Sequence, residues 1–152
     1  MLRTDVSIRQ ATPADAETIA RFNERLAVES EGHHLDPATI RAGVASALAD
    51  ETRALYFVAE INGQVVGQTL VTFEWSDWRN GFLWWLGSVY VLPEFRRRGI
   101  FRALARAVEG AARQAGSVGL RLYVRHENVR AQKTYVKLGW TDAHYRVMER
   151  IF

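Results

Sequence analysis

Apolar and polar residues alternate over short stretches of the chain and recur every three or four residues over longer ones, which predicts strands interleaved with helices. Residues 6–10 alternate like a strand. Thr12-Pro13 then opens a helix, with proline at its first position, that we expect to reach about residue 28. Asp36-Pro37 opens a second helix in the same way, and its apolar face should end near residue 50.

A hairpin occupies the middle of the predicted sheet. Residues 55–61 and 65–73 are rich in β-branched and aromatic side chains, and Asn62-Gly63 between them is typical of a tight turn. The two strands should therefore pair antiparallel. A polar and aromatic connection over residues 74–81 then leads into a third strand over residues 82–92.

The second half of the chain predicts a parallel pair of strands. A helix over residues 98–115 has an apolar stripe and ends at a glycine, and a strand over residues 119–124 follows it. A strand, a crossover helix and a strand in this order form a right-handed parallel unit. A short helix over residues 129–138 and a final strand around residues 145–151 complete an α/β fold, with a mixed and mostly antiparallel sheet flanked by helices.

The composition indicates one globular domain over residues 1–152, because the length fits a single hydrophobic core and no segment is of low complexity. Cysteine is absent, which excludes disulfides, thiolate metal ligands and an acyl-cysteine intermediate. The four histidines lack metal-ligand spacing, so we expect no metal. No uncharged apolar run approaches the roughly 20 residues that would cross a bilayer, so we expect a soluble, cytoplasmic protein without a membrane partner.

The placement of the arginines is more informative than the net charge of +3. Arg96, Arg97 and Arg98 are consecutive, and Gly99 follows them where the helix over residues 98–115 begins. The start of a helix carries unpaired amide groups and a partial positive charge, and glycine lets a phosphate approach the backbone closely. The segment therefore predicts a site for a compact anion such as a pyrophosphate. No wider basic face accompanies it, which argues against nucleic acid as a partner.

Two motifs resemble those of the GCN5-related N-acetyltransferase family. The acetyl-CoA motif of that family reads Gln or Arg, two residues, Gly, one residue, then Gly or Ala, and residues 96–100 follow it. Phe101 stands where the family usually has a small residue. Residues 128–140 resemble the C-terminal signature of the family, which combines Asn, Ala and Tyr with Leu-Gly and an aromatic residue.

This resemblance implies the acyl-CoA N-acyltransferase fold, in which the parallel strands splay apart, and acetyl-CoA as the co-substrate. It places the pantetheine arm between the strand that ends at Leu92 and a strand over residues 120–124. The cofactor-binding residues that it implies are Val89, Tyr90, Val91, Arg96, Arg97, Arg98, Gly99, Ile100, Phe101, Asn128 and Ala131.

The resemblance also places Tyr135 beside the cofactor sulfur, as a general acid. A phenol with a pKa near 10 stays protonated at neutral pH and can protonate a departing thiolate, whose conjugate acid has a pKa of about 8.5. Glu74 is the best-placed carboxylate to take the proton of the amine, directly or through water. Each residue also has a simpler interpretation: core packing for Tyr135, a helix cap for Asn128 and a solvated loop acid for Glu74.

We therefore expect direct transfer of an acetyl group from acetyl-CoA to a primary amine, with a backbone amide near Val91 polarising the thioester and no covalent enzyme intermediate. Acidic residues in the loops over residues 29–35 and 74–81 hint at a cationic acceptor, either a small molecule or a peptide. An aromatic-rich edge is compatible with a homodimer. The rival interpretations are a non-catalytic acyl-CoA-binding or regulatory module of the same fold and a nucleic-acid-binding module.

Overall fold

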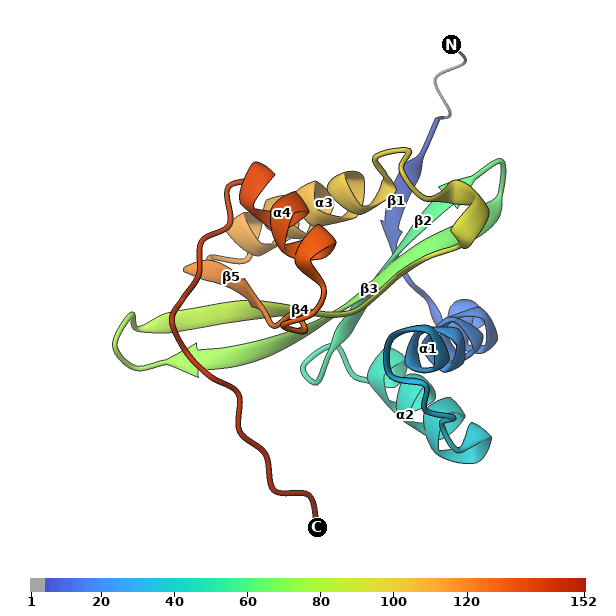
Figure 1. Cartoon of the computed structure of the whole chain (residues 1–152), viewed down its shortest axis with the longest axis horizontal. Helices are drawn as coiled ribbons and strands as arrows, with labels where there is room; N and C mark the ends of the chain where they lie inside the picture. Colours follow the sequence, from blue (N-terminus) through green and yellow to red (C-terminus); the bar gives the residue numbers. More distant parts are fainter. Residues whose placement is uncertain (1–4) are drawn as a thin grey trace. The chain divides into compact units, whose positions relative to one another are not determined.

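A computed structural model describes residues 5–152 (Figure 1). The chain forms two compact units. The first unit ends at Arg121 and contains the antiparallel strands. The second unit is Leu122–Phe152. The single domain expected from the sequence over residues 1–152 stays a prediction.

The first unit is built on a five-stranded sheet whose strands lie side by side in chain order. The strands are β1 (Ser7–Gln10), β2 (Leu55–Ile61), β3 (Gln64–Ser76), β4 (Gly81–Val91) and β5 (Gly119–Leu122). β1 to β4 pair antiparallel, whereas β5 runs parallel to β4. This arrangement confirms the predicted α/β class and the mixed, mostly antiparallel sheet.

The hairpin of β3 and β4 is longer than the sequence predicted. Residues 74–76 belong to β3 rather than to a connection over residues 74–81, and the turn is confined to residues 77–80. Trp75 lies opposite Phe82, with the ring centroids 5.1 Å apart in an edge-to-face arrangement. Cross-strand aromatic pairs stabilise antiparallel strands, so aromatic residues that we expected in a loop extend the sheet instead.

The helices of the first unit begin and end at local signals in the sequence. They are α1 (Ala16–Glu31), α2 (Pro37–Ala49) and α3 (Ile100–Gln114), with the 3-10 turns η1 (Pro13–Asp15) and η2 (Pro93–Phe95). α1 continues past the end predicted near residue 28 until Gly32, whose φ of 62° closes it. Asp36 caps α2 by accepting a hydrogen bond from the Thr39 N–H at 2.9 Å, and α2 has the predicted extent.

Helices cover both faces of this sheet, with α1 and α2 on one face and α3 on the other (Figure 1). Successive side chains of a strand point to opposite faces, and two neighbours on β3 show the division. Gln68 reaches Asn23 of α1, whereas a Cβ built at Gly67 would lie 3.2 Å from the Ile100 side chain of α3. The core accordingly has two parts, one around Ile19, Val44 and Val58 and the other around Ile100, Leu104 and Val108.

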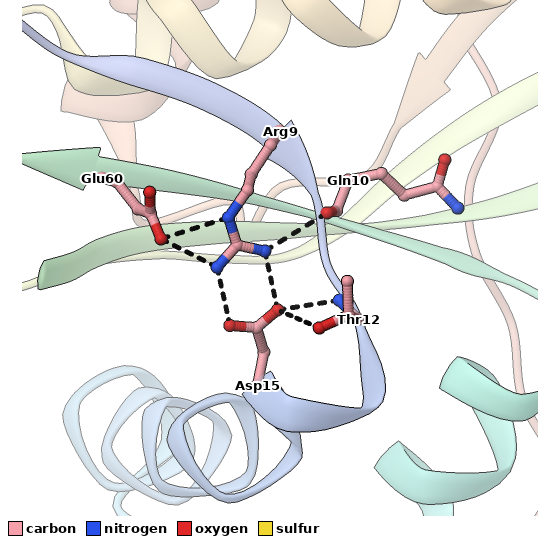
Figure 2. Close-up of polar contacts among 5 residues, drawn as sticks. All are labelled: Arg9, Gln10, Thr12, Asp15 and Glu60. Atoms are coloured by element: carbon pink, nitrogen blue, oxygen red, sulfur yellow. Dashed lines mark hydrogen bonds and ion pairs between the residues drawn. The ribbon is translucent and has the colours of Figure 1, made fainter. Parts of the chain in front are cut away.

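An ionic cluster joins β1, η1 and β2 at one corner of the first unit (Figure 2). The Arg9 guanidinium donates one hydrogen bond to each carboxylate oxygen of Asp15, both at 2.8 Å, and two more to Oε1 of Glu60. Asp15 is buried and also accepts a hydrogen bond from the Thr12 N–H at 2.7 Å. The hydrogen bonds from Arg9 hold the pKa of the Asp15 carboxyl below its usual range. Arg9, Asp15 and Glu60 are called the Arg9 cluster below.

The second unit contains α4 (Val129–Lys137), which begins where the sequence predicted. The prediction of a final strand around residues 145–151 is wrong, because none of the described residues after α4 is in a helix or a strand. Met148 is 88% exposed and Ile151 is 81% exposed. A strand is stable only where a paired backbone and a buried face support it, and an apolar sequence alone provides neither. Over residues 5–152, the helices are all too short or too polar to cross a bilayer.

Candidate active site

The turn from β4 into α3 has the backbone geometry of an anion site. Arg97 has a φ of 64° and Gly99 a φ of 79°, so both adopt the left-handed conformation just before α3 begins. A Cβ built at Gly99 would meet nothing within 4 Å, so it is the positive φ, and not a shortage of space, that favours glycine there. The first turn of α3 carries no acidic residue. Its amide groups and the positive end of the helix dipole therefore face no charge of opposite sign from the helix itself.

The start of α3 is held firmly against the sheet. Ile100 is 2% exposed, and its side chain would lie only 3.2 Å from a Cβ built at Gly67 of β3. This close approach fixes the position of the helix start relative to β3. Phe101, the next residue, is half-buried.

The three consecutive arginines are not equivalent. Arg97 and Arg98 are exposed, and the Arg98 guanidinium lies 5.3 Å from the centroid of the Phe95 ring. Arg96 donates from Nε to the Val91 carbonyl oxygen at 2.8 Å and from a terminal nitrogen to Glu29 Oε2 at 2.6 Å. Only Arg96 of the three is thus paired with a carboxylate among the described residues.

Glu29 lies in the last turn of α1, not in the loop over residues 29–35 where the sequence placed it. Its other oxygen accepts a hydrogen bond from the Tyr90 hydroxyl at 3.2 Å. Tyr90 is buried on β4, and burial, with the Glu29 carboxylate acting in the same direction, raises the pKa of its hydroxyl. The predicted cofactor residues Tyr90, Val91 and Arg96 therefore come together at α1.

A β-bulge interrupts β4 next to this turn. Gln68 pairs with Tyr90 and Leu70 with Gly87, so two residues of β4, Ser88 and Val89, lie opposite a single residue of β3. Ser88 has a φ of 46°, which is uncommon for a residue other than glycine. The bulge leaves backbone groups of residues 88 and 89 outside the regular ladder, where a ligand can use them. Val89, a predicted cofactor residue, lies in this bulge.

Two fully buried polar side chains of β3 hold the bulge in place. Gln68 donates from Nε2 to the Ser88 carbonyl oxygen at 3.2 Å, and the Thr69 hydroxyl donates to the Gly87 carbonyl oxygen at 3.1 Å. Gln68 also donates to Asn23 Oδ1 at 3.3 Å, which ties α1 to the bulge. The sequence reasoning missed these residues. An isolated glycine within a strand pattern, here Gly87, and adjacent polar residues in an apolar run were the available signals.

Glu74, the predicted base, is not brought to the bulge. It lies on β3 opposite Leu83, four positions along β4 from Gly87, which corresponds to about 13 Å of strand. Its carboxylate accepts a hydrogen bond from the Arg121 guanidinium at 2.7 Å, and the two side chains form an ion pair. The catalytic role of Glu74 stays a prediction.

The second unit contains the other predicted residues. Asn128 caps α4 by accepting a hydrogen bond at Oδ1 from the Ala131 N–H, at 3.1 Å. Ala131 and Tyr135 are four residues apart on α4 and therefore share a helix face. The Tyr135 ring centroid lies 6.2 Å from that of Trp140, and burial raises the pKa of the Tyr135 hydroxyl. The phenol is therefore protonated at neutral pH.

A mixed sheet with a bulged strand, followed by an arginine-rich turn into the start of a helix, is suited to binding a compact anion. Comparison with known proteins assigns the chain to one family. The model of the acetyltransferase (GNAT) family matches residues 18–140, and the chain belongs to this family. Membership confirms the predicted family and the predicted enzyme class, that of the acetyl-CoA-dependent N-acetyltransferases.

Relatives and solved structures agree with this assignment. The chain is 30% identical to an aminoglycoside N(6')-acetyltransferase type 1 from Stenotrophomonas maltophilia, over 99% of this chain and 96% of the relative. A crystal structure of a possible acetyltransferase from Clostridium difficile 630 is 41% identical, with a TM-score of 0.89 over 97% of both chains. The structure of AAC(6')-Iy with a bisubstrate analogue has a TM-score of 0.78 over 97% of this chain and 98% of that one, at 23% identity, and shows a shared fold.

Proposed function

We propose that this protein transfers the acetyl group of acetyl-CoA to a primary amine of a cationic small molecule. The observation that carries the proposal is the turn from β4 into α3, where two left-handed residues, exposed arginines and the acid-free start of a helix meet. The diphosphate of coenzyme A has the charge and size for such a turn. An aminoglycoside is the first acceptor class to test, because a relative that spans nearly the whole chain carries that substrate in its name.

In the proposed binding mode, backbone groups bind more of the cofactor than side chains do. Amide groups from Gly99 to Phe101 and the guanidinium groups of Arg97 and Arg98 bind the diphosphate. Backbone groups of Val89 and Val91 bind the pantetheine arm at the bulge. The resemblance of residues 128–140 to the C-terminal signature of the family supports a role for Asn128 and Ala131 in cofactor binding. Fixed backbone dipoles need no reorganisation during the reaction, which suits them to stabilise developing charge.

The proposed reaction is direct attack by the neutral amine on the thioester carbonyl carbon. The C–N bond forms, the carbonyl oxygen gains negative charge and accepts a hydrogen bond from a backbone N–H near Val91, and the C–S bond then breaks. Tyr135 gives its proton to the departing thiolate, which leaves as the free thiol. The extra proton of the amine passes to water, and the Tyr135 phenolate regains a proton from water, which restores the enzyme. The products are an N-acetylated amine and coenzyme A.

Thermal shift and turnover assays test this proposal together. Acetyl-CoA and coenzyme A should raise the melting temperature, because a ligand at a hundredfold excess over its Kd adds about 2.7 kcal/mol of stability. NAD and ATP at the same concentration should have much smaller effects. Release of free thiol should then appear with kanamycin or neamine and be slower with spermidine or free amino acids. Binding of acetyl-CoA without turnover on any amine would instead support the non-catalytic acyl-CoA-binding module.

A further inference from the structure

The side chains of Glu29 and Arg96 connect the diphosphate turn to the end of α1. The two residues are 67 positions apart in the sequence, and the Arg96 guanidinium is 2.6 Å from Glu29 Oε2. Arg96 also donates to the Val91 carbonyl oxygen and lies 5.5 Å from the centroid of the Tyr90 ring. Tyr90 in turn donates its hydroxyl hydrogen to Glu29. We propose that Glu29 and Arg96 are a positioning pair, which holds the turn ready for acetyl-CoA without contacting it.

The turn requires such a support because its backbone is unfavourable by itself. Arg97 has a positive φ without being glycine, and such conformations persist only where surrounding contacts impose them. The side chains of Arg97 and Arg98 are exposed, so they bury little surface that could do this. Arg96 immediately precedes them and is in an extended conformation, with a φ of −68° and a ψ of 157°. Its three contacts fix the direction in which the chain enters the turn.

The anchor for Arg96 is itself well placed. Tyr90 is 3% exposed, and its ring lies 5.1 Å from that of Phe22 of α1. A buried ring has little freedom, so its hydroxyl holds one oxygen of Glu29 while Arg96 takes the other. The pair is therefore prepared before any ligand arrives, and Arg96 directs its charge to Glu29 rather than to a phosphate. This inference rests on the proposed function, because it assigns the turn to the diphosphate of acetyl-CoA.

Removing the Glu29 charge tests whether this residue acts by positioning Arg96 or by long-range electrostatics. The measured quantity is the direction in which the Kd of coenzyme A changes. Coenzyme A is an anion, and loss of a nearby carboxylate should tighten its binding if long-range charge alone mattered. If Glu29 holds Arg96 in place, its loss should weaken binding, because a smaller fraction of the protein then has a competent turn. The two explanations predict opposite changes in Kd.

The test measures the Kd of coenzyme A by calorimetry for the wild-type protein, Glu29→Gln and Glu31→Gln. Glu31 ends the same helix and is exposed, so its variant removes the same charge as a matched control. We expect Glu29→Gln to raise the Kd about threefold to tenfold. Glu31→Gln should leave the Kd unchanged or slightly lower. The KM for acetyl-CoA should rise with the Kd in Glu29→Gln, whereas kcat at saturation should stay within about twofold.

Arg96→Lys keeps the inference open to refutation if Glu29→Gln folds poorly, and a double variant tests the pair if Glu29→Gln folds. Arg96→Lys retains the charge but loses the Nε donor to Val91, and it should weaken coenzyme A binding to a similar degree. In the double variant Glu29→Gln/Arg96→Gln, the second substitution should add little, because each one already breaks the pair. A Kd for Glu29→Gln equal to or below that of wild type would overturn the inference and leave the proposed function intact. A wild-type protein that does not bind coenzyme A would instead overturn the proposed function.

Discussion

Two arginine clusters in the first unit are built in opposite ways. In the Arg9 cluster, one guanidinium meets two carboxylates, from Asp15 and Glu60. In the turn from β4 into α3, only Arg96 of three consecutive arginines is paired with a carboxylate within residues 5–152, that of Glu29. The first cluster has no positive charge left to offer, whereas the second retains an excess that Arg97 and Arg98 expose. The same residue type is thus neutralised within the fold at one place and, in the proposed function, binds a ligand at the other.

Tyr135→Phe should have the largest effect of all the variants. It should change turnover, whereas variants of the two arginine clusters should change stability or ligand binding. The change removes one hydroxyl and leaves the ring in place, so stability and the Kd of acetyl-CoA should change little. Loss of the general acid should lower kcat about a hundredfold. Steady-state kinetics with a responsive amine and calorimetry on the same preparation measure both quantities. An unchanged kcat would remove Tyr135 from the mechanism.

The double variant Arg97→Gln/Arg98→Gln tests whether the excess charge of the turn serves binding. Two charge-assisted contacts to phosphate are lost, so the Kd of coenzyme A should rise about thirtyfold at low salt. The wild-type affinity should fall more steeply with added salt than that of the variant. The melting temperature without ligand should not change, because both side chains are exposed. A large loss of stability would mean that the turn resembles the Arg9 cluster after all.

Asp15→Asn is the converse test, in which stability should change and binding should not. The variant loses the charge-assisted hydrogen bonds from Arg9, and we expect a loss of about 1.5 kcal/mol in the free energy of unfolding. Urea titrations of both proteins measure this loss. The Kd of coenzyme A should stay at the wild-type value. A change in this Kd would show that the Arg9 cluster is energetically coupled to the turn from β4 into α3.

The pH dependence of stability provides a second measurement on Asp15. Arg9 holds the pKa of Asp15 in the folded protein below its unfolded value of about 3.9, so the folded state favours the ionised form. The stabilisation is therefore present above about pH 4 and is lost as the pH falls through the folded pKa. Unfolding free energies between pH 3 and pH 6 should fall less toward acid in Asp15→Asn than in the wild type. If the free energy of unfolding fell equally toward acid pH in the two proteins, this assignment to Asp15 would be contradicted.

Glu74→Gln has the smallest expected effect on turnover. Its carboxylate is paired with Arg121, and it lies about 13 Å along the strand from the bulge. We expect kcat/KM to fall less than about threefold, as for a half-buried ion pair that supports the sheet. A general base would instead contribute about a hundredfold. A loss of that size, with a changed acid limb in the pH profile, would restore the role predicted from the sequence.

Most elements of the fold were predictable because the signals that define them are local. Asn62-Gly63 specifies a hairpin, Asp36-Pro37 starts α2 and Asn128 starts α4. The motif of residues 96–100 likewise marked the turn before α3. Two predictions failed where the deciding partner was distant. Aromatic pairing across β3 and β4 extended a strand into a predicted loop, and the apolar alternation of residues 145–151 did not become a strand.

The sequence by itself therefore determined the order of most elements, the family and the position of the turn proposed to bind the diphosphate, since periodicity, caps and glycine positions act over a few residues. Only the tertiary structure decided which polar groups meet. Gln68 and Thr69 donate hydrogen bonds to the bulge at Ser88. Arg96 pairs with Glu29, and Arg121 pairs with Glu74. The physical reason is that these contacts join residues separated by 18 to 67 positions, and their short range makes them depend on the packing of α1, α3 and the sheet.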